Sequence, residues 1–216
     1  MLSVLEEGPG GLAALRRVPD AQWLSALAVD AVTLSLRAAD SLELVWWVDP
    51  GVGAVELEDA QYLVGEGPTP EAAARGCPMV VPDLEEESPG RWPILLAHRA
   101  GMGSTLRAVA AVPVCVGRAL VGVFAAYRRS PGPFLPGVLR TMGAAADAVG
   151  RQVARGPLEI PELHRDILHQ AAGAVSVREG ITTAEAAEFV RARLFTAGRD
   201  LIGSAEEILG HADREE

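Results

Sequence analysis

The sequence predicts an α+β fold in which helices flank an antiparallel sheet, followed by a small C-terminal domain of three helices. Runs rich in β-branched and aromatic residues lie in the first two thirds of the chain, between segments with helical apolar spacing. A Gly156-Pro157 break and Pro161 then precede a tail with helical periodicity only. We expect a flexible N-terminus at 1–17, a main domain at 18–155, a linker at 156–161 and a tail domain at 162–216.

The first half of the main domain is expected to contain one helix and two strands. Apolar residues at mostly helical spacing predict a helix over 18–39, with Asp20 as its N-cap. The run SLELVWWV at 41–48 is rich in strand-forming residues and ends at a turn, Asp49-Pro50-Gly51. Loose alternation of apolar and polar residues predicts a second strand over 55–64.

Glycine and proline divide the second half of the main domain. Gly65-Glu66-Gly67-Pro68 ends the preceding strand, and a short helix follows through Arg75. The remaining expected elements are a short strand at 79–81, a helix over 91–100, a hairpin of strands over 106–116 and 120–127, and a long helix over 134–155.

Composition indicates a bacterial protein of the cytoplasm. The formal net charge is -10, and all 19 basic residues are arginine, a bias that fits a GC-rich genome. This acidic balance disfavours broad binding to a phosphate backbone. No stretch reaches the roughly 18 apolar residues of a membrane span, and the N-terminus lacks the basic region of a secretory signal.

Motifs for metal binding, cofactor binding and catalysis are missing from the sequence. Cys77 and Cys115 are too far apart for a zinc-binding CxxC pair, and we expect both to be free and buried. The four histidines lack HxxxH or HExxH spacing, and the serines lack a GxSxG setting. Gly101-Met102-Gly103 lacks the rest of a dinucleotide fingerprint. We therefore expect no enzyme, no metal and no cofactor.

Four motifs in a fixed order carry a resemblance to a known family. They are Gly65-Glu66-Gly67-Pro68, Val80-Val81-Pro82-Asp83-Leu84, Arg91-Trp92-Pro93, and Ala111-Val112-Pro113-Val114 with Gly117 and Val121-Gly122-Val123. Over about Val18 to Ala154 the chain resembles a GAF domain of the actinobacterial type. The resemblance implies a sensory domain that responds to a small molecule or a protein signal. Family members commonly have cysteine after GEGP, where this chain has Thr69, so thiol chemistry is not implied there.

Aromatic residues are candidates for a ligand pocket over the sheet. We select Trp46, Tyr62 and Trp92 as pocket residues, with packing in the core as the competing role. If Trp46 and Trp47 alternate on a strand, one faces the core and the other is a candidate for an interface.

The tail is expected to form a compact three-helix unit. Gly180 supplies a helix stop, and Thr182 with Glu185 forms a capping box for the second helix. Helical spacing predicts a shared core that contains Ala171, Val190, Leu194, Ala205 and Ile208.

The tail also resembles a known family, the ANTAR domain of RNA-binding antiterminators. The residues that carry this resemblance are Gln170-Ala171-Ala172-Gly173, Ala186, Val190-Arg191, Gly198-Arg199, Leu201 and Ala205. Leu194 and Ala174 depart from the family pattern, in a way that fits a compensated repacking of one core. The resemblance implies binding to an RNA stem-loop.

The candidate RNA-binding residues are Arg191, Arg193, Phe195 and Arg199. Arginine pairs with phosphate, and an exposed aromatic ring can stack on a base. The alternative is a solvated helix face whose arginines pair with Glu188 and Asp200. Between Ile160 and Glu216 there are six arginines and eleven acidic residues, which disfavours RNA binding.

Together these features predict a signal-responsive antitermination regulator that acts as a homodimer. The first alternative is a GAF-fold signalling module whose degenerate tail mediates protein association without RNA. The second is an enzyme resembling the GAF-fold methionine sulfoxide reductases, which use cysteine chemistry. We rank it last because neither cysteine lies in a CxxC motif or beside a basic cluster.

Overall fold

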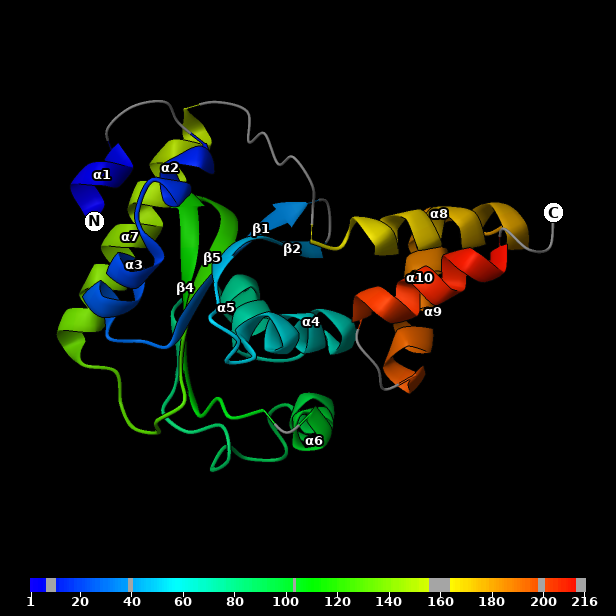
Figure 1. Cartoon of the computed structure of the whole chain (residues 1–216), viewed down its shortest axis with the longest axis horizontal. Coiled ribbons are helices and arrows are strands. Elements are labelled where there is room, and N and C mark those ends of the chain that lie inside the picture. Colours follow the sequence, from blue (N-terminus) through cyan, green and yellow to red (C-terminus); the bar gives the residue numbers. More distant parts are fainter. Residues whose placement is uncertain (7–10, 39–40, 103, 156–163, 198–200, 213–216) are drawn as a thin grey trace. The chain divides into compact units, whose positions relative to one another are not determined.

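The computed structural model describes residues 1–216 except 7–10, 39–40, 103, 156–163, 198–200 and 213–216 (Figure 1). The chain divides into two compact units, Met1–Pro161 and Glu162–Glu216. The predicted linker at 156–161 lies outside the described residues. Among the helices of the described residues, none combines the length and the apolar character that crossing a membrane requires.

The first unit is built on a five-stranded sheet in the order β2-β1-β5-β4-β3. All four neighbouring pairs are antiparallel, as predicted. The strands are β1 (Ala31–Ala38), β2 (Ser41–Val48), β3 (Met79–Val81), β4 (Ala108–Val116) and β5 (Ala119–Arg128). The predicted hairpin of β4 and β5 is confirmed, with Gly117 in the left-handed region between them.

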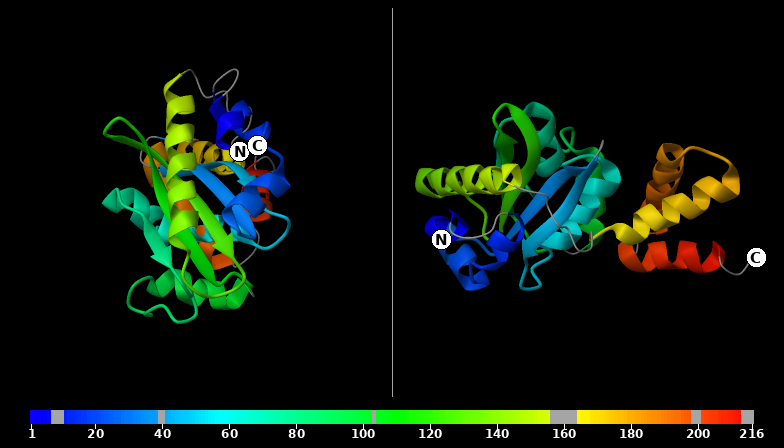
Figure 2. Two further views of the ribbon diagram at one scale, coloured as in Figure 1. Left: turned by 90° about the vertical axis from the view of Figure 1, so that its left-hand side faces the viewer. Right: turned by 90° about the horizontal axis from the view of Figure 1, so that it is seen from above.

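One face of the sheet is covered by α3 (Asp20–Leu27) and α7 (Pro136–Ala154), and Figure 2 shows α7 lying across the strands. Trp23 of α3 packs against this face, with its ring centroid 5.1 Å from that of Trp46 and 5.7 Å from that of Phe124. A Cβ atom on Gly150 of α7 would lie 2.3 Å from the carbonyl oxygen of Cys115. The close approach of α7 to β4 therefore requires glycine at this position.

The opposite face is covered by α4 (Ala54–Val64) and α5 (Pro68–Arg75), and α6 (Pro93–Met102) packs against α4 (Figure 1). Apolar side chains from these helices, the sheet and the loop before α6 form one buried cluster, which includes Leu57, Ala72, Leu84, Trp92, Leu95, Val109, Val123 and Tyr127. Burial of these side chains supplies the main driving force that holds this helical layer on the sheet.

Residues 1–17, expected to form a flexible N-terminus, contain α1 (Leu2–Glu6) and α2 (Ala13–Arg16) in their described part. Leu5, Leu12 and Leu15 are buried. The buried side chain of Gln152 on α7 donates from Nε2 to the carbonyl oxygen of Leu5 at 2.6 Å. Apolar burial and this hydrogen bond place the described part of the segment against α7, and its flexibility stays a prediction.

Two further predictions are wrong. The helix expected over 18–39 ends at Leu27, where Ala28 adopts a left-handed backbone, and 31–38 forms strand β1. The strand expected over 55–64 is helix α4. Its N-terminus is capped by Asp49, whose carboxylate accepts hydrogen bonds from four backbone N–H groups.

The second unit contains, in its described part, helices α8 (Asp166–Glu179), α9 (Thr183–Ala197) and α10 (Leu201–Ala212). Ala171, Val190, Leu194 and Ala205 are buried, as predicted, and nothing is described of the side chain of Ile208. The capping box also forms: Thr182 N donates to Glu185 Oε2 at 2.9 Å, and Glu185 N donates to Thr182 Oγ1 at 3.2 Å.

Candidate functional site

A buried polar cluster lies between the sheet and its α4–α5 layer. The carboxylate of Glu58 on α4 accepts hydrogen bonds at Oε1 from the hydroxyls of Thr33 on β1 and Thr69 on α5, both at 2.9 Å. The hydroxyl of Tyr127 on β5 donates to the same oxygen. All four residues are at most 3% exposed, so the cluster is enclosed by protein.

In this cluster three protonated hydroxyl groups surround one carboxylate, that of Glu58. Burial, with the adjacent Glu58 carboxylate, raises the pKa of Tyr127 well above its usual value. Tyr127 therefore keeps its proton and donates a hydrogen bond to Glu58. A carboxylate inside an apolar cluster would be costly without such partners. The hydrogen bonds join four elements (β1, α4, α5 and β5) at one carboxylate oxygen.

The loop Gly65-Glu66-Gly67-Pro68, between α4 and α5, is hydrogen-bonded to α6. Glu66 Oε2 accepts hydrogen bonds from the backbone N–H groups of Ile94 at 2.9 Å and Leu95 at 3.1 Å, so it caps the first turn of α6. Gly67 has a φ of 129°, and a Cβ atom there would lie 2.5 Å from Gln61 Oε1. The motif therefore has a structural role: Glu66 caps α6, and Gly67 fits closely against Gln61 of α4.

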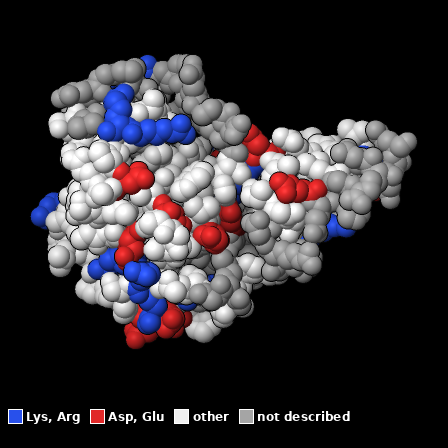
Figure 3. Space-filling model, viewed as in Figure 1, with Lys and Arg blue, Asp and Glu red and all other residues white. Residues whose placement is uncertain are grey.

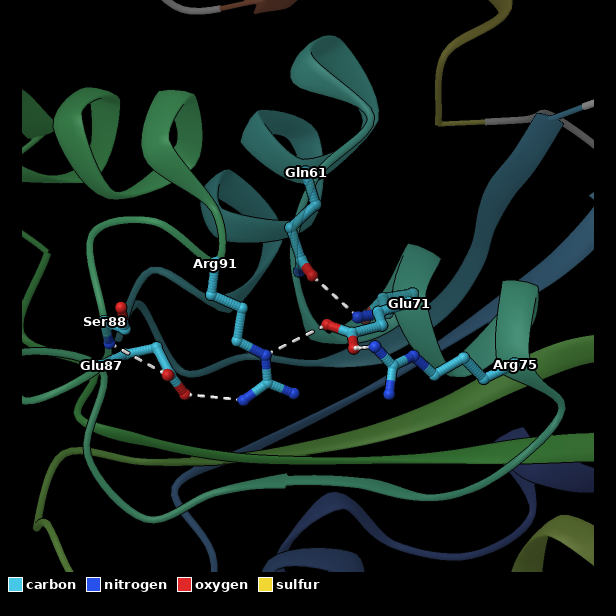
Figure 4. A network of polar contacts seen from close by, with 7 residues as sticks. Gln61, Glu71, Arg75, Glu87, Ser88 and Arg91 are labelled. Carbon is cyan, nitrogen blue, oxygen red and sulfur yellow. Dashed lines mark hydrogen bonds and ion pairs between the residues drawn. The ribbon is translucent and has the colours of Figure 1, made fainter.

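A charged network lies beside this loop (Figure 4). Arg91 pairs with Glu71 at 3.2 Å and with Glu87 at 2.8 Å, and Arg75 pairs with Glu71 at 2.9 Å. The Arg91 guanidinium also lies 4.3 Å from the ring centroid of Trp92. Figure 3 shows acidic and basic side chains beside one another over part of this side of the molecule. The two arginines and two glutamates of this network balance in charge, so they form no surface patch of a single sign.

The three aromatic pocket candidates do not line one pocket. Trp46 is 6% exposed and packs with Trp23 on the α3 side of the sheet. Trp92 is buried in the cluster on the α4 side, and Tyr62 is half-buried on α4. The predicted shared pocket is corrected because the sheet separates Trp46 from Trp92. The expectation that one tryptophan of the pair faces inward is confirmed, since Trp47 is 41% exposed.

Cys77 and Cys115 are free, as expected, but both are exposed. The expectation of burial is corrected. Cys77 follows the end of α5 in a turn, and Cys115 lies near the end of β4, next to the turn of the β4–β5 hairpin. Neither cysteine belongs to the buried cluster on the α4 side of the sheet.

The RNA-binding candidates lie on α9 or outside the described residues. Arg191 pairs with Glu188 of the same helix, as in the predicted alternative, and its side chain is 24% exposed. Arg193 is exposed, and Phe195 is 37% exposed. Arg199 lies outside the described residues, as does Asp200. On α9 the structure thus brings Arg191, Arg193 and Phe195 onto the surface of one helix.

Sequence reasoning did not select Glu58, Thr33 or Tyr127. The pattern of burial along α4 gives the reason: Ala54, Leu57, Glu58 and Gln61 face inward at helical spacing. Two of these inward positions are polar, so the apolar periodicity that marks a buried helix face is broken. An acidic residue at an inward helical position is the signal that would have identified the cluster.

Comparisons with known proteins identify the fold of the first unit. The family model of the GAF domain matches residues 21–153. The chain is similar to free methionine-R-sulfoxide reductase from Neisseria meningitidis, with a TM-score of 0.53, 19% identity, and coverage of 71% of this chain and 84% of that one. It is also similar to the GAF domain of a phosphoenolpyruvate-protein phosphotransferase from Coxiella burnetii, with a TM-score of 0.52, 17% identity, and coverage of 69% and 86%. No curated protein sequence gives a significant match.

Proposed function

The chain belongs to the GAF domain family, and we propose that it is a signal-responsive regulator of transcription antitermination. In this proposal the GAF unit receives a small-molecule or protein signal, and the C-terminal helical unit binds an RNA stem-loop as a homodimer. The matched segment, 21–153, covers more than half of the chain and supports the sensory part. The resemblance of the tail to ANTAR domains supports the RNA-binding part.

One structural observation carries the RNA-binding proposal: α9 presents an arginine and a phenylalanine together, away from its packed side. Ala186, Val190 and Leu194 define the buried side of α9. Arg191 and Phe195 are four residues apart, so they are neighbours on a different face of the helix. A guanidinium beside an exposed ring offers a phosphate contact and a stacking surface in one place.

The acidic surroundings predict weak and salt-sensitive binding. Glu188 engages Arg191, so a phosphate must compete with this carboxylate. Each phosphate contact releases counterions, and its loss lowers the slope of affinity against salt by about 1. The binding is therefore expected at low ionic strength and expected to decline steeply as salt is added.

The test is RNA binding by the full chain, measured by fluorescence anisotropy with a labelled hairpin RNA. Arg191→Ala is expected to weaken binding at every salt concentration and to flatten the salt dependence. Phe195→Ala is expected to weaken binding about 5- to 150-fold, the effect of losing one base–aromatic stack. Arg199→Ala is expected to behave like Arg191→Ala, because the family pattern also places an arginine there.

Arg178→Ala is the matched control for the arginine variants. Arg178 lies on α8 and pairs with Glu179, outside the surface of α9. Binding that is equally reduced by Arg178→Ala indicates a general charge effect and contradicts the proposed site. If the folded chain binds no RNA at low salt, the proposal is contradicted, and sedimentation analysis then tests the alternative that the tail mediates protein association.

A further inference from the structure

We propose that Phe189 is a second aromatic residue of the RNA-binding surface on α9 and stacks on an unpaired base. This inference rests on the proposed function and adds a residue that neither family resemblance selects. It also specifies the RNA: only bases outside a paired helix offer a free face to an aromatic side chain, so the surface is expected to bind a loop rather than a duplex.

Exposure is the first observation that supports this role. Phe189 is 48% exposed, which is more than the 37% of Phe195. The next residue, Val190, is only 1% exposed, so Phe189 lies just outside the packed side of the helix. An exposed phenylalanine on a helix whose core is already filled is available to a partner.

The arrangement of charges is the second observation. Arg193 follows Phe189 by four residues, and Phe195 follows Arg191 by four, so each exposed ring has an arginine one helical turn away. Two phenylalanine–arginine pairs therefore lie on one helix, in opposite order along the chain, and the arginine of the second pair is engaged by Glu188. An arginine beside each ring favours a nucleic acid over an apolar protein partner, because a guanidinium can contact the phosphate that adjoins a stacked base.

Helix geometry separates the two rings. At 1.5 Å per residue, Phe189 and Phe195 are about 9 Å apart along the axis and about 120° apart around it. Adjacent stacked bases are about 3.4 Å apart, so the two rings cannot lie in one continuous stack. We therefore infer that they contact two bases that are not neighbours in a stack, as in an RNA loop whose bases are splayed apart.

The experiment measures binding of the full chain to a labelled hairpin RNA with an unpaired loop, and to a fully paired duplex with the same stem. Phe189→Ala is expected to weaken hairpin binding about 5- to 150-fold and to leave the weaker duplex binding unchanged. Phe189→Tyr retains an aromatic face and is expected to bind like the parent chain. Phe189→Leu retains apolar surface without that face and is expected to behave like Phe189→Ala.

Val177→Ala is the matched control, because Val177 is 86% exposed on the neighbouring helix α8 and lies outside the proposed surface. Circular dichroism confirms that each variant keeps its helices. If the parent chain binds the hairpin but Phe189→Ala binds equally well, or Phe189→Leu matches Phe189→Tyr, the stacking role is wrong and the proposed function stands. If the parent chain binds neither RNA, the proposed function itself fails. If Phe189→Ala weakens self-association instead, a second copy covers this ring.

Discussion

A single carboxylate, that of Asp49, organises the start of α4. Asp49 Oδ1 accepts hydrogen bonds from the N–H groups of Gly51 and Val52, and Oδ2 accepts them from Ala54 and Val55, at 2.7 to 3.1 Å. Ala54 and Val55 lie in the first turn of α4, where backbone N–H groups have no partner within the helix, and Gly51 and Val52 lie in the turn before it. The residue that the sequence indicates only as part of a turn is therefore also a helix cap.

We predict that Asp49→Ala lowers the free energy of unfolding by about 0.5–2 kcal/mol, the usual cost of losing a cap. Asp49→Asn keeps a side-chain oxygen and is expected to cost less. Urea unfolding followed by circular dichroism measures both. Equal stability of Asp49→Ala and the parent chain would show that the four contacts contribute nothing net.

The cluster around Glu58 gives a second prediction at this scale. Tyr127→Phe removes one of the three hydroxyl donors and leaves a buried carboxylate less well solvated, so it is expected to cost about 1–3 kcal/mol. Urea unfolding followed by circular dichroism measures this loss. If Tyr127→Phe is as stable as the parent chain, the donor role of Tyr127 is refuted.

At the scale of elements, the capping box of α9 gives a pH dependence. Hydrogen bonds from the backbone and the hydroxyl of Thr182 lower the pKa of Glu185 below its usual 4.5. A lowered pKa means that this contribution to stability is present above the unfolded-state value and is lost as the pH falls through the folded-state value. The start of α9 should therefore lose protection at acidic pH.

Amide hydrogen exchange at residues 182–186, expressed as protection factors, tests this expectation. Protection in the parent chain should fall as the pH is lowered below the usual pKa of 4.5. Glu185→Gln keeps a side-chain acceptor without the titrating group, so its protection should change little over that range. A parent chain and a Glu185→Gln variant with parallel pH profiles would exclude Glu185 as the cause.

The packed side of α9 gives a prediction about the same unit. Val190 is 1% exposed, so Val190→Asp would bury an unpaired charge and is expected to unfold the C-terminal helices. Ala192→Asp adds the same charge at an exposed position of α9 and is the control. Loss of helical circular dichroism in the first variant alone supports the packing. Full helicity in Val190→Asp would count against it.

Sequence patterns predicted some elements well and failed at others for identifiable reasons. β2 was predictable because its run of β-formers is bounded by a turn residue. β1 was not, although Val32, Leu34 and Leu36 alternate with Ala31, Thr33 and Ser35, because no glycine or proline separates this run from the helical spacing of residues 20–27. α4 was missed because Glu58 and Gln61 occupy inward positions. The prediction of a shared aromatic pocket failed for a different reason: the sequence does not show on which face of the sheet each aromatic side chain lies.

At the scale of the whole molecule, the chain combines a GAF unit with a separate helical unit. The family match and the structural similarities concern the first unit, which they identify by fold. The buried carboxylate of Glu58 joins α4 and α5 to the sheet within that unit. The output that we propose depends on the second unit, through the arginines and phenylalanines of α9.

The most direct test of this account compares RNA binding by the full chain with binding by the chain ended at Arg155. The first compact unit extends to Pro161, so the shorter chain retains the GAF sheet and its covering helices. At low salt, we predict that the full chain binds a labelled hairpin RNA and that the shorter chain, which remains folded by circular dichroism, does not. Equal binding by both chains, or no binding by the folded full chain, would contradict RNA recognition by the C-terminal helices.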